Sequence, residues 1–344
     1  MSAAPHQTVS IVGGGLAGLA LGVALRRAEV PVELFEAGDY PRHRVCGEFM
    51  AGLDDATVRQ LGIAEALADA GAERRVTWYL RNEAVGGQTL PHPARTISRF
   101  VLDARLVDQF TALGGRLERG VRRAVPPNAP GWVDAAGRRR SARSPWIGLK
   151  AHFGGIDASA GLELHLGDGA YVGLAAVEDG WVNVCGLFRR RSGLTMDRDS
   201  ALPAYLRASG LDGLADRLVA GSRRLDSASA VAALHFDRKV GVGDGIRLGD
   251  AVAMIPPFTG NGMAMALIGA ACAVDPLVAW ARRERSWPET VGSVQSALQA
   301  EFRTRLAGAS LLHPFLVNPA LQRGLGAAAR TGLLPLTRLY HLLH

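Results

Sequence analysis

The fold of this chain is decided by the stretch Thr8-Val9-Ser10-Ile11-Val12-Gly13-Gly14-Gly15-Leu16-Ala17-Gly18. Residues 8–12 form a short β-branched run, 13–18 a glycine turn, and 16–28 an Ala- and Leu-rich segment that predicts a helix. The run Val32–Phe35 predicts a second strand. Strand, turn, helix and strand follow one another within about 30 residues, a unit that places the glycine turn at the carboxyl edge of a parallel sheet.

Three glycines of the turn, Gly13, Gly15 and Gly18, have the spacing G-x-G-x-x-G between a strand and a helix, as in a dinucleotide-binding turn. The first glycine allows the tight turn, the second lets the backbone approach a pyrophosphate, and the third lets helix and strand pack closely. The helix that begins with Leu16 and Ala17 directs its free N–H groups and its positive dipole end at the phosphates.

The acidic residue that this kind of turn requires is Glu36, which follows Gly18 by 18 residues and closes the second strand. A carboxylate there can accept hydrogen bonds from both ribose hydroxyls of an adenosine, and its charge would repel a 2′-phosphate. The alternative is a glycine-rich turn without a ligand and an ordinary surface glutamate. The combination of these parts at the right spacing favours the dinucleotide site.

Composition excludes several classes of protein. Of the 344 residues, 48% are hydrophobic and 21% are charged, as in an ordinary globular protein, and the length suits two or three domains. The net charge of +7 permits binding to anions, but the arginines are scattered and lack interleaved aromatic residues, so we expect no nucleic-acid partner. Cys46, Cys185 and Cys272 lie far apart, which argues against a disulfide framework and against a metal site.

Targeting signals are also missing from the sequence. The first residues lack the pattern of a signal peptide, and the longest apolar run, Met263–Val274, is too short to span a bilayer. We therefore expect a cytoplasmic protein.

A second glycine-bearing turn lies far along the chain. The pair Gly249-Asp250 ends an apparent strand within 245–257. After six further residues come Pro257, Gly260, Gly262 and Met263, which open an Ala- and Met-rich helix predicted for 262–281. Taken alone, Asp250 could be an N-cap or part of an Asx turn.

The two turns, together with Ser98-Arg99 and the segment 102–106, resemble the flavoprotein family of aromatic hydroxylases, flavin halogenases and geranylgeranyl reductases over residues 9–281. The resemblance implies bound FAD. It also implies that Asp250 binds the ribityl chain and that the loop from Pro257 to Met263 passes beside the isoalloxazine ring. A helix N-terminus there would stabilise the negative charge that a flavin gains on two-electron reduction.

The segment Pro41-Arg42-His43-Arg44-Val45-Cys46-Gly47-Glu48-Phe49-Met50 is most similar to the branch of geranylgeranyl reductases and related oxidoreductases found beside polyketide synthases. By this resemblance, Arg44 contacts FAD, Arg99 helps to hold its adenine side, and the Cys46-Gly47 step lies beside the flavin ring.

Three residues are candidates for catalysis, each with a structural alternative. Cys46 could be a redox-active or proton-donating thiol, or a small residue packed on the flavin. Glu48 could be an active-site acid, or the ion-pair partner of an arginine such as Arg44. His152 could transfer a proton, because histidine is the side chain best suited to proton transfer near neutral pH. A lone histidine on a strand, however, is more often a structural hydrogen-bonding residue.

The predicted fold class is α/β, with a Rossmann-like FAD-binding domain of the glutathione-reductase type, an antiparallel-sheet substrate domain and a helical C-terminal tail. The FAD-binding domain is assigned to residues 1–75, 97–145 and 240–281, the substrate domain to 76–96 and 146–239, and the tail to 282–344. Pro314, Pro319 and Pro335 interrupt the basic, Leu-rich tail, so we expect it to pack on the body rather than to anchor the protein at a membrane surface.

The sequence departs from each branch of the family. Tyr171-Val172-Gly173-Leu174-Ala175-Ala176 stands where geranylgeranyl reductases carry Y-x-W-x-F-P, and the W-x-W-x-x-P element of flavin halogenases is missing. The hypothesis is an FAD-dependent oxidoreductase, a monooxygenase or reductase that acts on a small lipophilic, polyketide-like or isoprenoid substrate with NAD(P)H as a transient reductant. The alternative is a catalytically impaired flavin-binding protein, because the middle segment 120–146 is shortened.

Overall fold

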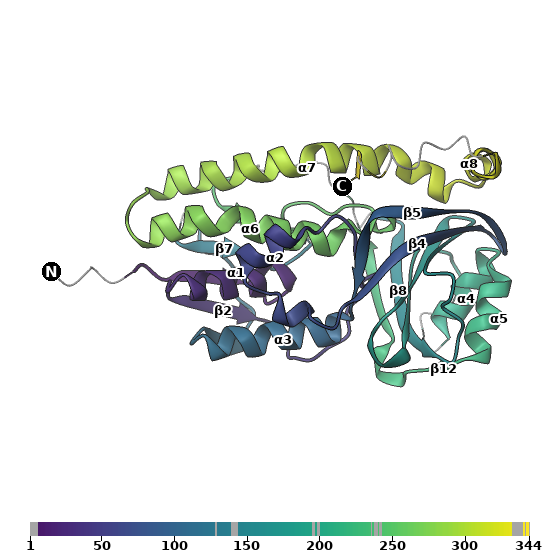
Figure 1. The fold of residues 1–344 in the computed structure, drawn as a ribbon, viewed down its shortest axis with the longest axis horizontal. Coiled ribbons are helices and arrows are strands. Elements are labelled where there is room, and N and C mark those ends of the chain that lie inside the picture. The colour runs from purple at the N-terminus through teal and green to yellow at the C-terminus, as the bar shows by residue number, and fades with distance from the viewer. Residues whose placement is uncertain are drawn as a thin grey trace.

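The structure of the protein is a computed structural model. It describes residues 6–331 except 128, 139–143, 195–196, 198–199, 235, 237–239 and 241–242, and in the C-terminal segment residues 340, 342 and 343. Two sheets stand side by side, and helices cover them (Figure 1).

The first sheet is parallel and carries the glycine turn. Its strand order is β14-β7-β1-β2-β6, the arrangement of a dinucleotide-binding sheet in which the first strand lies at the centre. The strands are β1 (Val9–Val12), β2 (Val32–Glu36), β6 (Arg116–Arg119), β7 (Trp132–Asp134) and β14 (Ile246–Arg247). All four residues of β1 are buried, as expected of a central parallel strand.

Helix α1 (Leu16–Arg27) packs against α3 (Arg99–Ala112) and against α6 (Asn261–Ala281). The short helix α2 (Asp55–Leu61) also contacts α6. Residues 263–274 lie within α6, which has 21 residues and is by length and composition apolar enough to cross a membrane. This corrects the expectation that the run is too short. Because α6 is packed between α1 and α7, the structure places it as a core helix.

The second sheet has the order β12-β8-β11-β10-β9-β4-β5-β3, with β13 also paired to β8. The strands are β3 (Phe49–Met50), β4 (Gly71–Leu80), β5 (Glu83–Thr96), β8 (Trp146–Gly154), β9 (Leu162–Gly167), β10 (Ala170–Ala176), β11 (Val182–Arg189), β12 (Ser222–Arg223) and β13 (Ser229–Leu234). The predicted antiparallel sheet is in fact mixed, because β4 and β9 run parallel. β3 and the first half of β4 pair here although the sequence assigned residues 1–75 to the other domain.

The strands β8, β10 and β11 of the second sheet present alternate side chains to two different environments. Leu149, Val172 and Val184 belong to a core formed with α4 (Ala201–Ala208) and α5 (Asp212–Ala220). Side chains one position away, such as Tyr171 and Cys185, line the cavity described below. The alternation therefore divides the sheet into a helix-covered face and a face that is free to line a site.

The C-terminal region is helical, as expected, through α7 (Trp287–Val317) and α8 (Pro319–Arg330). α7 runs along both halves of the molecule and packs on α6 through buried residues such as Leu298 and Phe302 (Figure 1). Pro314 lies inside α7 instead of ending it, and Pro319 begins α8. Pro335 lies outside the described residues.

Two strands differ from the sequence-based expectation. Residues 120–146, predicted as turns, contain β7, which pairs with β1. A strand of three residues leaves little pattern in the sequence, and its position is fixed by backbone pairing with its neighbours. The strand predicted within 245–257 is reduced to the two residues of β14.

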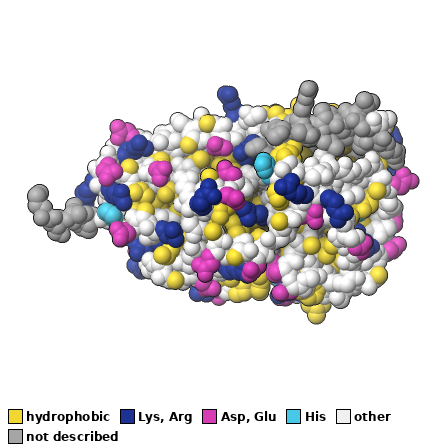
Figure 2. Space-filling model, in the orientation of Figure 1, with side chains coloured by type: hydrophobic (Ala, Val, Ile, Leu, Met, Phe, Trp, Pro, Cys, Tyr) yellow, Lys and Arg dark blue, Asp and Glu magenta, His cyan; other side chains and the backbone are white. Residues whose placement is uncertain are grey.

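The surface carries charges of both signs. Figure 2 shows basic and acidic side chains interspersed over the visible face, with apolar atoms between them.

Candidate functional site

One cavity of about 1080 Å³ joins the two glycine-bearing turns. Gly13 and Gly15 line it from the first turn, and Asp250 and Gly262 line it from the second. It continues onto the open face of the second sheet, where Trp78, Tyr171 and Leu187 belong to its wall. The volume is that of a cofactor or ligand site, and a groove connects residues that lie about 235 positions apart in the chain (Gly15 and Asp250).

The three glycines of the first turn, Gly13, Gly15 and Gly18, differ in why the structure requires glycine at their positions. Gly13 has φ +105°, and a Cβ there would lie 2.2 Å from the carbonyl oxygen of Ala135. A Cβ on Gly18 would lie 2.0 Å from the carbonyl oxygen of Gly13. A Cβ on Gly15 would meet no atom within 4 Å. Packing therefore demands Gly13 and Gly18, whereas Gly15 keeps open the cavity at the start of α1.

Glu36 is buried at the end of β2 and faces the turn. Its Oε2 accepts from the N–H of Gly14 at 2.8 Å, and its Oε1 accepts from the N–H of Gly38 at 2.8 Å and from Arg42 Nη2 at 2.5 Å. Burial alone would raise the pKa of Glu36, but these N–H donors together with Arg42 and Arg44 hold it below its usual value. The carboxylate is thus kept ionised as a hydrogen-bond acceptor beside the turn.

Arg44 and Arg99 share one buried carboxylate. Asp103 on α3 accepts from Arg44 Nε at 3.0 Å and from Arg99 Nε and Nη2 at 2.7 and 2.8 Å. Asp103 is fully buried, and both arginines line the cavity. The Nη2 atom of Arg44 is buried and has no hydrogen-bond partner among the described residues. Nη2 lies 3.9 Å from Glu36 Oε2, so Arg44 presents an unused N–H donor in the wall of the site while its charge is paired with Glu36 and Asp103.

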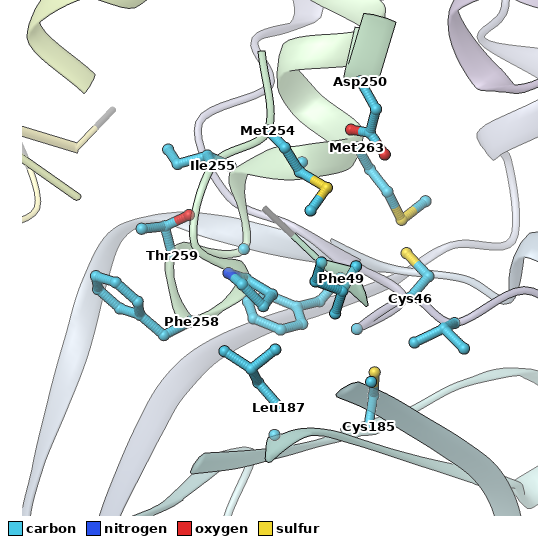
Figure 3. A pocket seen from close by; sticks show the side chains of 18 of the residues that line it. Cys46, Phe49, Cys185, Leu187, Asp250, Met254, Ile255, Phe258, Thr259 and Met263 are labelled. Atoms are coloured by element: carbon cyan, nitrogen blue, oxygen red, sulfur yellow. The ribbon is translucent and has the colours of Figure 1, made fainter. Parts of the chain in front are cut away.

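The second turn consists of two short 3-10 helices, at Gly249–Ala251 and Pro257–Thr259, followed by α6. Gly260 has φ +68°, and a Cβ there would lie 2.2 Å from the ring of Phe49, so the close approach of Phe49 requires glycine. Asp250 points into the cavity beside Met263 (Figure 3). Burial in this protein-walled space raises the pKa of Asp250.

Glu48 and His152 form a buried cluster with Lys150. Glu48 Oε2 lies 2.6 Å from His152 Nε2, and Glu48 Oε1 lies 3.2 Å from Lys150 Nζ and accepts from the N–H of Arg99 at 3.0 Å. The side chains of Glu48, Lys150 and His152 have no exposed surface. Burial alone would raise the pKa of Glu48, but His152 and Lys150 lower it overall.

Because Lys150 Nζ also contacts His43 Nδ1 at 3.1 Å, the cluster already holds a cation where a metal would have to bind. Neither Glu48 nor His152 lines the cavity. The cluster fastens the loop that carries Cys46 to strand β8. The ion-pair interpretation of Glu48 therefore fits the geometry, but with Lys150 and His152 as partners instead of Arg44.

Cys46 lines the cavity from this loop, and Cys185 lines it from β11. Asn183 Nδ2 donates to the carbonyl oxygen of Cys46 at 3.0 Å, which holds the loop on the strand two residues from Cys185. Figure 3 shows the two cysteine side chains entering the same space. The sequence singled out only Cys46, because nothing in the chain marks Cys185 as its neighbour.

The far end of the cavity is apolar. Its wall is formed by Trp78, Leu80, Leu164, Leu166, Tyr171, Leu187, Met254, Phe258, Leu312 and Phe315. The charged side chains among the lining residues lie mainly at the other end, around the two turns. Trp78, Leu164 and Tyr171 lie on β4, β9 and β10, where successive side chains point to opposite faces of the sheet. This period of two was the sequence signal that could have identified them as cavity-lining residues.

Most of the predicted site residues meet in the cavity. Those that line it are Gly13, Gly15, Leu16, Ala17, Glu36, Arg44, Cys46, Arg99, Asp250, Pro257, Gly260, Gly262 and Met263. Gly18, Glu48 and His152 do not line it. Sequence reasoning missed Arg42, which binds Glu36, and Tyr40, whose hydroxyl donates to the carbonyl oxygen of Gly14.

Comparison with known proteins gives matches in sequence family and in fold. The NAD(P)-binding Rossmann-like domain matches residues 11–45. The comparison with curated proteins gives no match.

Three similar solved structures cover nearly the whole chain. p-Nitrophenol 4-monooxygenase from Pseudomonas putida has a TM-score of 0.75 and 14% identity, and covers 98% of this chain and 97% of its own. HpxO from Klebsiella pneumoniae complexed with FAD and uric acid has a TM-score of 0.74 and 17% identity, and covers 98% of this chain and 95% of its own. The flavin-dependent brominase Bmp2 has a TM-score of 0.73 and 17% identity, and covers 99% of this chain and 93% of its own. The resemblance inferred from the sequence is therefore confirmed at the level of the fold.

Proposed function

We propose that this protein, which has the fold of FAD-dependent monooxygenases and flavin halogenases, is an FAD-dependent oxidoreductase. The observation that carries the proposal is the single cavity that contacts both Gly15 and Asp250. A dinucleotide lying along this cavity would contact the N-terminus of α1 at one end and the N-terminus of α6 at the other. Similar structures include HpxO complexed with FAD and a probable FAD-dependent monooxygenase from Pseudomonas aeruginosa.

The residues present fit such a group. Space for a pyrophosphate exists at Gly15, where a Cβ would meet no protein atom. Glu36 would supply an ionised acceptor for ribose hydroxyls, and Arg44 Nη2, which has no hydrogen-bond partner among the described residues, would supply a buried N–H donor. Asp250 supplies a carboxyl group for the ribityl hydroxyls. Together these residues would offer polar partners at both the dinucleotide end and the ribityl part of FAD.

Bound FAD would supply two-electron redox chemistry, and the protein would supply orientation and a dry site. The N-terminus of α6 at Asn261 and Gly262 would stabilise negative charge on the ring. The apolar wall around Leu187 and Phe258 would exclude water from the reacting face. Cys46 remains our candidate for a group in direct contact with the reacting atoms, whereas Glu48 and His152 are assigned to positioning of its loop.

The substrate that suits the apolar end is a small lipophilic molecule, of polyketide-like or isoprenoid type. We propose NAD(P)H as a transient reductant, since the described residues contain one glycine-rich dinucleotide turn and that turn is assigned to FAD. The similar structures favour oxygen insertion over alkene reduction, because they are monooxygenases and a flavin-dependent brominase. The geranylgeranyl reductase-like subtype and a cytoplasmic location stay predictions.

The test is anaerobic addition of NADPH or NADH to the purified, FAD-loaded protein. We expect the flavin band to bleach and to return in air, with oxygen consumed. Gly15→Val, whose side chain would fill the cavity, is expected to fold but to purify without FAD. If wild-type protein holds FAD that dithionite reduces but neither nicotinamide reduces, the impaired flavin-binding alternative is correct. If it holds no FAD at all, the proposal is wrong.

A further inference from the structure

Two thiols that the proposed reaction does not require to act together face the same cavity. Cys46 lies on the loop between β2 and β3, and Cys185 lies at the middle of β11 (Figure 3). Both are partly exposed to the cavity, and both are free thiols. Cys272, the third cysteine, lies on α6 and does not line this cavity.

The loop of Cys46 rests directly on β11. The carbonyl oxygen of Cys46 accepts from Asn183 Nδ2 at 3.0 Å, and Asn183 is two residues from Cys185 on the same face of the strand. Cys46 itself is held by the N–H of Glu48, which donates to its Sγ at 3.5 Å. The hydrogen bond from Asn183 to the carbonyl oxygen of Cys46 leaves no room for a ligand between the loop and the strand at that point.

We propose that Cys46 and Cys185 are an oxidisable pair that forms a disulfide when hydrogen peroxide is produced inside the cavity. This inference rests on the proposed function only for the source of peroxide, which a reduced flavin releases when oxygen is reduced without transfer to a substrate. The pairing of the two thiols rests on the structure alone.

The chemistry is balanced with peroxide as the only oxidant. One thiol loses its proton, its thiolate sulfur attacks a peroxide oxygen and the O–O bond breaks, so that a sulfenic acid forms and the departing hydroxide takes up the proton as water. The second thiol then attacks the sulfenic sulfur, the S–O bond breaks, and the disulfide and a second water form. Two electrons pass from the two thiols to one peroxide, and their two protons leave in water.

The environment makes the pair selective for an oxidant formed nearby. Burial raises the pKa of both thiols, against the lowering effect of Arg99 on Cys46 and of Lys150 on Cys185. The N–H of Cys46 also lies close enough to the Cys185 sulfur to act on its pKa. Protonated thiols react slowly with dilute oxidant in bulk solvent, so a high local concentration is needed.

Two methionine side chains that line the same cavity are also sensitive to peroxide. Met254 and Met263 line the same cavity as Cys46, and their thioethers face the same space (Figure 3). Peroxide converts a methionine to its polar sulfoxide, which would disrupt an apolar cofactor wall. Peroxide that the thiol pair consumes does not reach these thioethers, and a reductant can restore the two thiols.

The experiment uses the FAD-loaded full chain turned over with NAD(P)H in air without substrate, and in parallel treated with added hydrogen peroxide. Free thiols are counted after denaturation, and intact and peptide masses are measured without reduction. We expect the thiol count of wild-type protein to fall from three to one, with loss of two hydrogens and a peptide that links Cys46 to Cys185. Dithiothreitol is expected to restore all three thiols.

The three cysteines provide matched variants. Cys272→Ser is expected to form the same disulfide as the wild type. Cys46→Ser and Cys185→Ser are expected to gain oxygen atoms in place of losing hydrogens, with more sulfoxide at Met254 and Met263. A disulfide that includes Cys272, or equal oxidation of Met263 in wild-type and Cys46→Ser proteins, would overturn the proposal, as would three free thiols after excess peroxide.

Failure of the proposed function gives a different result. A protein that binds no FAD makes no peroxide from NAD(P)H, so turnover leaves its thiols reduced. Added peroxide still links Cys46 to Cys185 in that case, and the thiol pair stands while the flavin assignment falls.

Discussion

His152 Nε2 lies 2.6 Å from Glu48 Oε2, and neither side chain has any surface exposed to solvent. The pair joins the loop after β2 to the strand β8 of the other sheet, and Lys150 balances its charge. A contact between buried ionic groups contributes little net stability when intact, but its rupture leaves an uncompensated charge.

Removal of the Glu48 charge is therefore expected to be costly. Glu48→Gln leaves Lys150 buried and unpaired, and the free energy of unfolding at pH 7 should fall by about 3–5 kcal/mol in urea titrations. The control is Glu33→Gln, which breaks the exposed pair with Arg116 and should have a much smaller effect. If Glu48→Gln with Lys150→Met does not recover part of the loss, the cluster is not held by this charge balance.

Gly13 and Gly15 are expected to separate fold from cofactor binding. Gly13→Ala places a Cβ against the carbonyl oxygen of Ala135 at a positive φ, so strain and overlap should lower the free energy of unfolding by about 2–5 kcal/mol. Gly15→Val meets no protein atom at its Cβ and has extended backbone, so the free energy of unfolding should change by less than about 1 kcal/mol.

The affinity of Gly13→Ala and Gly15→Val for FAD is measured by fluorescence quenching and compared with their stability. We expect Gly15→Val to bind FAD at least about tenfold more weakly than wild-type protein. Unchanged affinity in Gly15→Val would show that the cavity at the start of α1 is not the pyrophosphate site.

Asp103 is expected to organise both arginines of the site. Asp103→Asn removes the charge that Arg44 and Arg99 share, and it should lower the free energy of unfolding by about 3 kcal/mol and also weaken FAD binding. Asp108→Asn, at an exposed position of the same helix, is the matched control and should change neither quantity. Equal behaviour of the two variants would remove Asp103 from the site.

The stability of the protein in acid is expected to depend on His313. This residue packs against Trp146, Tyr171 and Phe236, and neither ring nitrogen has a partner among the described residues. Burial lowers the pKa of His313 to about 4. The unfolded chain, with the ordinary value near 6.5, binds the proton first, so the stability contributed by neutral His313 is present above about pH 6.5 and is lost as the pH falls toward 4.

His313→Leu removes this titration. We expect its thermal midpoint to decrease less than that of the wild type between pH 7 and pH 5, while the two proteins stay close at pH 8. Parallel curves for the two proteins over this range would show that His313 is not responsible. His43, whose pKa is lowered to about 4 by burial and by Lys150, should account for part of the loss that remains.

The sequence by itself determined the first half of the site. The spacing of Gly13, Gly15 and Gly18 between a strand and a helix, with Glu36 at the end of the next strand, is local information. It suffices because a βαβ unit brings these residues together within one supersecondary motif. The role of the second turn at Asp250 came from the resemblance to the flavoprotein family, since local spacing alone left an N-cap or an Asx turn open.

Only the tertiary structure decided which side chains of the second half meet the first. Trp78 on β4 reaches the same cavity as Tyr171 on β10 and Cys185 on β11 because β4 pairs in parallel with β9, a segment far along the chain. Likewise, Glu48 and His152 looked like independent catalytic candidates until β8 brought them within hydrogen-bond distance, away from the cavity. Local spacing fixes contacts within a motif, whereas contacts between sheets depend on register and on the burial of one face, which are properties of the whole fold.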